Sequence, residues 1–275
     1  MKNQLGNVLI DIDATRITRH HPRANTILPG ETAFEIVPFK LLILAGGFGS
    51  RLQSILPDKP KALAPVGEVP FLALQLENWI AQGIRSFVFL LHHQANQITD
   101  FLDGIKSGPL KDCEVKSLIE PRPMDTGGAV AYAVRELSLN GDFLVANADT
   151  WLGAGIGELT ASHAPSMAVI QLDDSSRYGQ VQFDDSHRIT AFTEKYTLSA
   201  PGWINAGLCR LHAELFKNWD GARFSLEKQT FPSLVGRGEL QAVAINSDFI
   251  DIGIPADYQR FCRWIEEGRK STLCK

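Results

Sequence analysis

The sequence predicts a three-layer α/β fold in which helices cover both faces of a mixed, mostly parallel sheet. Two observations carry this prediction. From residue 40 onward, short apolar runs alternate with helical patterns, which is typical of parallel βα units. Between residues 166 and 211, strand-like runs follow one another without helices, which predicts a small antiparallel insertion. Ligands of such sheets bind at the carboxyl ends of the strands, so the polar residues there are the candidates for function.

The first half of the chain alternates regularly. Apolar runs predict strands over 40–45, 86–93, 113–120 and 142–149. Helical patterns lie between them, over 71–82, 94–102 and 126–137. Pro70 opens the first of these helices and Gly83 closes it, in agreement with the usual positions of proline and glycine at helix ends.

The second half is richer in strands. They are expected over 166–172, 179–183, 188–195, 203–211 and 240–245. Helices are expected around 225–235 and over 255–268. Residues 1–38 are different: VLIDID (8–13) could be a strand, but TRITRHHPRANTILPGET (15–32) is polar, basic and rich in turn residues. The sequence therefore predicts an N-terminal extension over 1–38 and one folded domain over 39–275.

Composition narrows the class of protein. The 275 residues are 44% hydrophobic with a net charge of −4, whereas a dedicated nucleic-acid binder usually carries a basic surplus. No apolar run approaches the ~18 residues of a membrane span, and no signal peptide is evident. The four cysteines are scattered without a CxxC pair, as in reduced cytosolic proteins. We expect a cytoplasmic protein that binds neither nucleic acid nor membrane.

The first motif is LAGGFGSRL, directly after the strand predicted at 40–45. Glycines allow a backbone to approach a phosphate closely, and an arginine adds charge. The motif lacks the third glycine of GxGxxG, and the chain has no GxxxxGK[ST]. On its glycines alone, it is equally compatible with an ordinary turn from strand to helix. Its candidate phosphate-binding residues are Ala45, Gly46, Gly47, Gly49, Ser50 and Arg51.

The segment PDKPKALAPVGEVPF (57–71) follows within ten residues, and the two together resemble the nucleotide-binding signature of the sugar nucleotidyltransferase family. The resemblance implies a Rossmann-like nucleotidyltransferase fold. It also implies that Arg51 and Lys61 hold a nucleoside triphosphate and neutralise charge at its α-phosphorus. Lys59 is a second cation nearby, which we interpret as a solvated surface residue.

EPRPMDTGGAVAYA (120–133) resembles the base-recognition loop of the same family. The resemblance implies nucleotide contacts from Glu120, Asp125, Thr126, Gly127 and Gly128. The family often has Leu-Gly where this chain has Met-Asp. Asp125 has two equally weighted interpretations: an acceptor for the base, or a cap for the helix that begins near Thr126. A plain helix N-terminus is the alternative for the whole motif.

Two aspartates resemble the metal ligands of the family. Asp149 follows an apolar strand, and Asp251 lies in FIDIGIPADY, which is similar to the family pattern Asp-x-Gly-Thr-Pro-x-Asp-Tyr. The resemblance implies that the two carboxylates bind Mg²⁺, whose other ligands would be waters and phosphate oxygens. Either aspartate alone would be typical of a cap or a turn.

Three further segments, RYGQVQFD, FTEKY and WINAGL, resemble the sugar-phosphate side of the family's site. Glu194 and Asn205 match residues that hold sugar hydroxyls, Gly179 permits close approach of the ring, and Lys195 matches the lysine on the sugar's phosphate. An exposed Glu194–Lys195 ion pair without function is the alternative.

The resemblance implies transfer of a nucleotidyl group to a sugar 1-phosphate with release of pyrophosphate, and it allows a homodimer. Residues 51–84 and FSLEKQTFPSLV are most similar to guanylyltransferases of manno-heptose 1-phosphate, which favours GTP as the nucleotide. Mannose 1-phosphate or another hexose phosphate is the alternative substrate. A catalytically silent sugar-nucleotide sensor and a phosphatase built on Asp11 and Asp13 are the rival functions, and the second has too little chain around it for such a domain.

Overall fold

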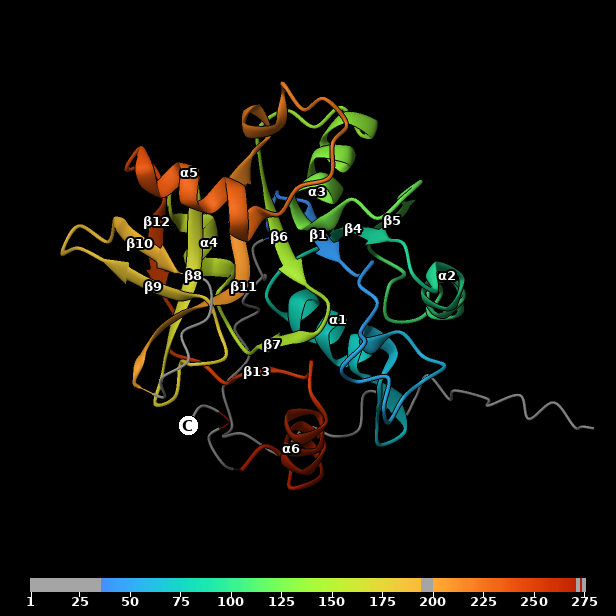
Figure 1. Ribbon diagram of the computed structural model, residues 1–275. Helices are drawn as coiled ribbons and strands as arrows, with labels where there is room; N and C mark the ends of the chain where they lie inside the picture. Colours follow the sequence, from blue (N-terminus) through green and yellow to red (C-terminus); the bar gives the residue numbers. More distant parts are fainter. Residues whose placement is uncertain (1–35, 194–199, 271–272, 274–275) are drawn as a thin grey trace, which may run out of the picture.

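The computed structural model describes residues 36–193, 200–270 and 273, and a mixed nine-stranded sheet forms its centre (Figure 1). β1 (Leu41–Leu44) lies between β6 (Asp142–Asn147) and β4 (Ser86–Leu91), and β5 (Glu114–Ile119) pairs with β4. These four strands are parallel to one another, so the mostly parallel half of the predicted sheet is confirmed.

The antiparallel part of the sheet is organised around β11 (Gly202–His212). This strand pairs with β6 on one side and with β8 (Ser166–Leu172) and β9 (Gln180–Phe183) in its other portion. β10 (Ile189–Thr193) extends the sheet from β9, and β12 (Gln241–Ala244) pairs in parallel with β8. The predicted antiparallel insertion is confirmed, and β11 joins it to the parallel half.

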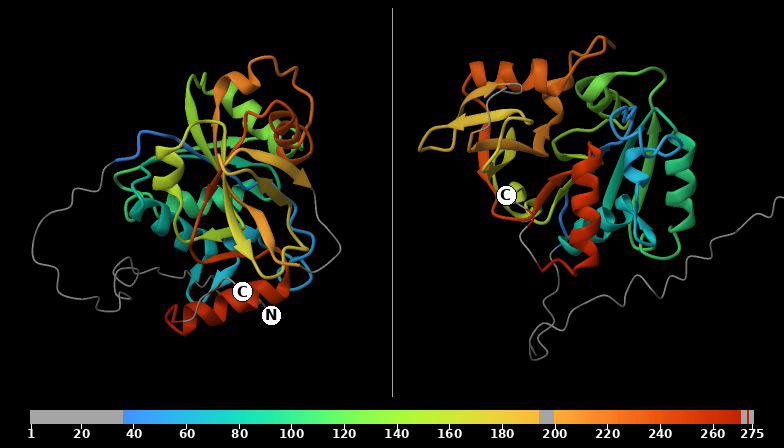
Figure 2. Two further views of the ribbon diagram at one scale, coloured as in Figure 1. Left: turned by 90° about the vertical axis from the view of Figure 1, so that its left-hand side faces the viewer. Right: turned by 60° about the horizontal axis from the view of Figure 1, so that its bottom comes forward.

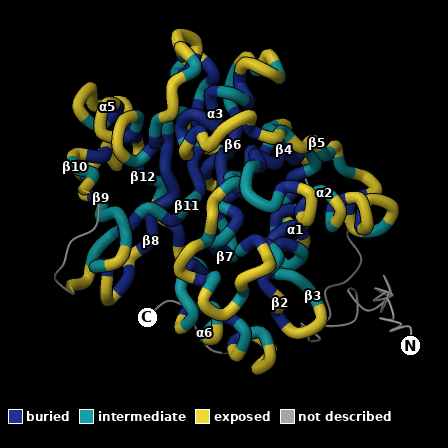
Figure 3. The backbone as a smooth tube through the Cα atoms, turned by 45° about the vertical axis from the view of Figure 1, so that its right-hand side comes forward, coloured by how far each residue is buried: buried dark blue, intermediate teal, exposed yellow. Residues whose placement is uncertain are grey.

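Helices cover both faces of the sheet, as predicted. On one face lie α1 (Phe71–Ala81), α2 (Ala95–Gly104) and α4 (Ile156–Ala161). On the other face lie α3 (Asp125–Glu136) and α5 (Phe231–Gly236), the latter entered through a π-helical turn, Leu226–Thr230. α1 buries Leu72, Leu76 and Trp79, whose spacing places them on one side of the helix. The central strands β1, β4, β6 and β8 are largely buried between these layers, whereas the edge strand β5 is half-buried or exposed along its length (Figure 3).

A third cluster of apolar side chains lies beside the main sheet, around a ribbon that the sequence did not reveal. β7 (Thr150–Leu152) pairs antiparallel with β13 (Phe249–Asp251), and α6 (Pro255–Glu266) packs below them (Figures 1 and 2). The strand expected over 142–149 ends at Asn147, so Asp149 lies in the turn between β6 and β7. The chain turns here because β7 leaves the main sheet to pair with β13.

The remaining elements are short. β2 (Pro65–Val66) and β3 (Val69–Pro70) form a small hairpin, and 3-10 turns occupy Lys61–Leu63 and Ala213–Phe216. Near the start of the described chain, the Val37 N–H donates to Gly83 O at 3.1 Å. Within the described residues, none of the helices combines the length and apolar character that a membrane crossing requires.

Candidate active site

The β7–β13 ribbon brings together two carboxylates that are about a hundred residues apart in the chain. Asp149 directly precedes β7, and Asp251 is the last residue of β13, paired in register with Thr150. The next residue, Ile252, donates its N–H to Asp149 O at 2.9 Å. The backbone therefore fixes the two aspartates as neighbours at the edge where β6 ends.

Asp251 lies in an environment that disfavours its charge. Burial, followed by the negative charge of Asp149, raises the pKa of Asp251 to about 6. The Gly253 N–H, which donates to Asp251 Oδ1 at 2.6 Å, and the cations Lys61 and Arg51 act in the opposite direction. Two carboxylates held this closely form a site that gains from added positive charge.

Two cations, one in the glycine-rich loop and one shortly after it, lie close to these carboxylates. Lys61 Nζ lies 2.7 Å from Asp149 Oδ2, and the Lys61 side chain is only 18% exposed. A Cβ atom placed on Gly253 would lie 3.3 Å from Lys61 Nζ, 3.3 Å from Arg51 Nη2 and 2.6 Å from Asp251 Oδ1. Gly253 is thus surrounded by charged groups, and its missing side chain leaves room for them.

The glycine-rich loop passes over Lys61 and reaches the end of β5. Gly49 adopts a φ of 63°, and a Cβ there would lie 2.8 Å from Lys61 Cγ. At Gly46, a Cβ would lie 2.9 Å from Glu120 Oε1. Ala45 continues the pairing of β1 with a hydrogen bond from its N–H to Leu90 O. Gly47 and Ser50 are exposed on the outer side of the loop.

Glu120 connects this loop to the predicted base-recognition loop. Its side chain is buried at the carboxyl end of β5, and its Oε2 accepts the Met124 N–H at 2.9 Å. Burial raises the pKa of Glu120, against the hydrogen bond from Met124 and the nearby His92. Its other oxygen faces Gly46. A buried acceptor beside a glycine loop is suited to a ligand that carries N–H donors.

The other predicted base contacts divide into two groups. Asp125 is exposed, with a φ of 61°, and its Oδ1 accepts the Thr126 N–H at 2.9 Å, while Arg223 Nη2 lies 3.5 Å from its Oδ2. Gly127 and Gly128 are buried, and both donate their N–H groups to Phe224 O at 3.0 Å. The structure thus places these glycines against Phe224, while Asp125 remains at the surface beside them.

The predicted sugar side adjoins the carboxylates along β11. Asn205 donates its N–H to Gly179 O at 3.1 Å, and its Oδ1 accepts the Gly207 N–H at 2.9 Å. A Cβ on Gly207 would lie 2.8 Å from Asn147 Nδ2, at the start of the turn that contains Asp149. The structure therefore brings Gly179 and Asn205 close to this turn. Glu194 and Lys195 lie outside the described residues, as do Asp11 and Asp13.

Sequence reasoning missed two contributors to this geometry. Gly253 lies in the FIDIGIPADY motif. A glycine two residues after a candidate metal ligand was the signal that could have identified it. Gln75 is buried in α1, where it bonds the turn that contains Asp149. A glutamine among apolar residues of a predicted helix was the only sign of its role.

Comparisons with known proteins identify the family of the chain. The model of the nucleotidyl transferase family matches residues 40–267. A D-glycero-alpha-D-manno-heptose 1-phosphate guanylyltransferase of Campylobacter jejuni is 30% identical over 225 residues, covering 80% of this chain and 97% of the relative. Mannose-1-phosphate guanylyltransferase 1 of Arabidopsis thaliana is 32% identical over 252 residues, covering 86% of this chain and 67% of that protein.

Among solved structures, HddC from Yersinia pseudotuberculosis, in complex with GMP-PN, has the same fold. The match has a TM-score of 0.71 and 29% identity, and it covers 82% of this chain and 99% of HddC. The fold and family predicted from the motifs are confirmed. The chain belongs to the nucleotidyl transferase family.

Proposed function

We propose that this protein transfers a nucleotidyl group from a nucleoside triphosphate to a sugar 1-phosphate and releases pyrophosphate. The observation that carries the proposal is the placement of Lys61 and Arg51 around Gly253, opposite Asp149 and Asp251. In this reaction a phosphate oxygen of the sugar attacks the α-phosphorus, and the bond to pyrophosphate breaks. The nucleophile is already anionic at neutral pH, so positioning and charge neutralisation are sufficient for catalysis.

Asp149 and Asp251 would hold Mg²⁺. The donor set fits, because carboxylate oxygens are preferred ligands, and a cation between the two groups would offset both the burial and the repulsion from Asp149 that raise the pKa of Asp251. Within the described residues, no group of three or more acidic, histidine or cysteine side chains offers an alternative metal site. When bound, the ion supplies positive charge to the triphosphate oxygens. Lys61, now paired with Asp149, would then be available to a phosphate.

We assign the nucleotide side to the 45–51 loop, Glu120 and Asp125, with GTP as the preferred nucleotide. Guanine presents N1–H and an exocyclic amine, which are donors that the buried Glu120 carboxylate could accept. Adenine lacks N1–H and a 2-amino group and would leave Glu120 Oε1 without these bonds, at a cost of about 1–3 kcal/mol. The names of the relatives from Campylobacter and Arabidopsis, both guanylyltransferases, support this choice.

Gly179 and Asn205 are assigned to the sugar, together with Glu194 and Lys195. A manno-configured heptose 1-phosphate is the favoured substrate. The Campylobacter relative supports this choice, because the match extends over 97% of that guanylyltransferase. Mannose 1-phosphate is the alternative, supported by the Arabidopsis relative. Nucleoside triphosphates are cytoplasmic metabolites, and we place the reaction in that compartment.

A matrix of nucleoside triphosphates against sugar 1-phosphates, with pyrophosphate release as the readout, tests the proposal. We expect release only when both substrates and Mg²⁺ are present, and the fastest release with GTP and the heptose phosphate. Faster turnover with mannose 1-phosphate would change the sugar and keep the reaction. Preference for a pyrimidine triphosphate would exclude the guanylyl assignment, and ligand binding without turnover would identify a silent sensor.

A further inference from the structure

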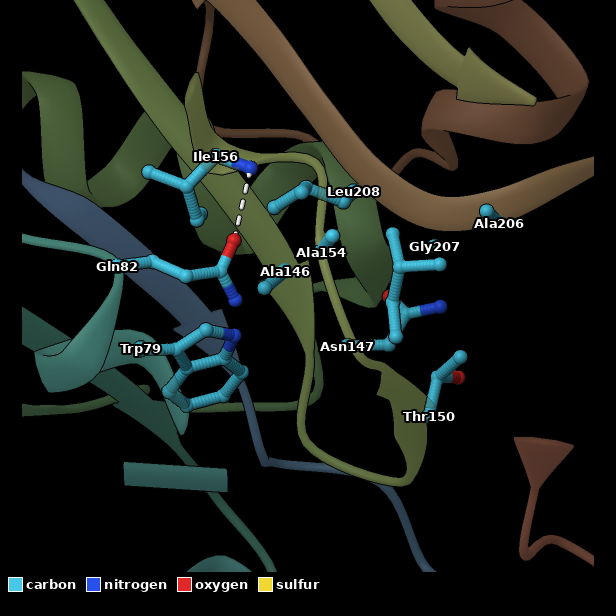
Figure 4. Close-up of a pocket in the computed structure, with 11 residues that line it drawn as sticks. Trp79, Gln82, Ala146, Asn147, Thr150, Ala154, Ile156, Ala206, Gly207 and Leu208 are labelled. Carbon is cyan, nitrogen blue, oxygen red and sulfur yellow. Dashed lines mark hydrogen bonds between the residues drawn. The ribbon is translucent and has the colours of Figure 1, made fainter. Parts of the chain in front are cut away.

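Three amide side chains line one side of α1. Gln75 and Asn78 lie within the helix, and Gln82 directly follows its last residue. Their spacing of three and four residues places them in a row along the helix. All three bond the backbone of one segment, residues 147–156, which contains the Asp149 turn and β7. We call this row the amide ladder. Its last member, Gln82, lines a cavity of about 10 Å³ together with Trp79 and residues of the segment and of β11 (Figure 4).

Gln75 is the member of the ladder that lies nearest the carboxylates. Its Nε2 donates to Thr150 O at 2.8 Å and to Asn147 O at 3.3 Å, so one side chain binds both carbonyls that flank the Asp149 turn. Gln75 is 1% exposed, and its Oε1 has no hydrogen-bond partner. Burying a half-satisfied amide is unfavourable, and leucine would fill the same place without that cost.

The other two members of the ladder bond positions farther along. Asn78 Nδ2 donates to Leu152 O at 2.9 Å, at the end of β7. Gln82 donates to Gly153 O at 3.4 Å and accepts the Ile156 N–H at 3.2 Å, as Figure 4 shows for the second bond. These contacts satisfy backbone groups at the entry to α4. Only Gln75 bonds the two residues on either side of the turn.

We propose that Gln75 is a positioning residue, which fixes the Asp149 turn and thereby the spacing of Asp149 and Asp251. This inference rests on the proposed function, since it concerns the same pair of carboxylates. The connection is short: Gln75 bonds Thr150 O, Thr150 is paired with Asp251, and Ile252 N–H bonds Asp149 O. Without Gln75, the turn would lose both side-chain hydrogen bonds that hold its carbonyls to α1.

The test compares Gln75→Met with Gln82→Met. Both variants replace one glutamine of the amide ladder by an apolar side chain of similar length. Both also remove two hydrogen bonds to the 147–156 segment. A purely structural role of the ladder would make them equivalent. We would measure kcat, the KM of the sugar phosphate, the Mg²⁺ concentration at half-maximal rate, the Kd for Mn²⁺ by electron paramagnetic resonance, and Tm.

For Gln75→Met we expect a kcat at least about tenfold lower and a Mn²⁺ Kd about 10–100-fold higher, the usual effect of removing a group that orients a metal ligand. The KM of the sugar phosphate should change little. Gln82→Met should keep kcat and the Mn²⁺ Kd within about twofold, because its contacts lie beyond β7. Equal effects of the two variants, or a normal Mn²⁺ Kd in Gln75→Met, would overturn the inference.

Gln75→Asn is the second variant, because it keeps the amide in the core and shortens its reach by one methylene. It replaces Gln75→Met if that protein does not fold, with the same expectations. Unfolding of both variants would assign Gln75 to stability alone and overturn the inference. The Mn²⁺ measurement needs no turnover, so it separates this inference from the proposed function: a parent protein that binds Mn²⁺ without releasing pyrophosphate contradicts only the latter.

Discussion

At the scale of single residues, the proposed site consists of two carboxylates and two cationic side chains around Gly253. Lys61 is mostly buried and paired with Asp149, whereas the Arg51 guanidinium approaches from an exposed loop. Any side chain on Gly253 would have to displace at least Asp251, whose oxygen lies 2.6 Å from the added atom. The four charges are therefore packed closely enough for each to depend on the others.

Lys61→Ala and Arg51→Ala should each lower kcat/KM by about 10²–10³, which is the scale of losing one preorganised charge contact in a water-poor site. Steady-state kinetics with the preferred substrate pair would measure the loss. Lys59→Ala provides the control, because Lys59 is exposed and close in sequence. If the three variants lose only a fewfold alike, the 45–61 region is structural and the site is elsewhere.

Asp251→Asn should abolish turnover yet stabilise the metal-free protein above pH 6. The pKa of Asp251 is 3.8 ordinarily and about 6 in the fold, so the folded state retains the proton longer. Stability is therefore lost as pH rises from about 4 to 6, by up to about 3 kcal/mol, and asparagine avoids this loss.

Thermal unfolding in the presence of a chelator would check this expectation. The Tm of Asp251→Asn should exceed that of the parent by a few degrees at pH 7.5, with no such difference at pH 4. A variant that is less stable than its parent at pH 7.5 would show that the charge of Asp251 stabilises the fold even without metal.

At the scale of elements, the N-terminus of α3 is held by a segment about a hundred residues later in the chain. Thr126 Oγ1 donates to Glu227 Oε2 at 2.6 Å and accepts the Leu226 N–H at 2.9 Å. A Cβ on Gly127 would lie 2.2 Å from the Phe224 ring. Packing against the Phe224 ring thus explains Gly127. A Cβ on Gly128 would lie 3.0 Å from Met124 Cβ, and this close contact explains the second glycine, whatever else this loop binds.

Gly127→Ala should destabilise the protein by about 1–3 kcal/mol, because the added methyl group overlaps a ring in a packed region. Phe224→Ala removes that ring, so the double variant should lose less stability than the two single losses added together. Urea unfolding of the four proteins measures the coupling. Strict additivity would mean that Phe224 moves aside without cost.

The elements that the sequence predicted are those with a long hydrophobic pattern. α1 was expected at 71–82 and lies at Phe71–Ala81, because Pro70 and Gly83 mark its ends and its apolar residues recur at helical spacing. β7 and β13 have three residues each, too few for any periodicity, and their pairing depends on residues far apart in the chain. The candidate residues were therefore predictable from motifs, whereas the ribbon that joins Asp149 to Asp251 was not.

At the scale of the whole molecule, one continuous strand unites the two halves of the proposed site. β11 pairs with β6 of the parallel half and with β8 and β9 of the antiparallel half, and it contains Asn205 and Gly207. The nine strands that the structure describes in the main sheet all lie from Leu41 onward.

Deletion of residues 1–35 should therefore leave a folded enzyme with kcat/KM close to that of the full chain. The truncation keeps Val37, whose N–H bonds Gly83 O. Circular dichroism and the pyrophosphate assay would check the two parts of this expectation. Loss of activity in a folded truncated protein would instead assign a role in the site to the predicted extension.

The β7–β13 ribbon also determines when activity arises during folding. Its two strands are separated by about a hundred residues, so the chain must be present through Asp251 before the second carboxylate can join the first. Closing a loop of about a hundred residues carries an entropic cost that grows only slowly with length, yet it must precede the contacts that offset it. Refolding should accordingly restore secondary structure first and metal affinity last. A chain interrupted before Phe249 should retain the glycine-rich loop but have no activity, because it lacks Asp251.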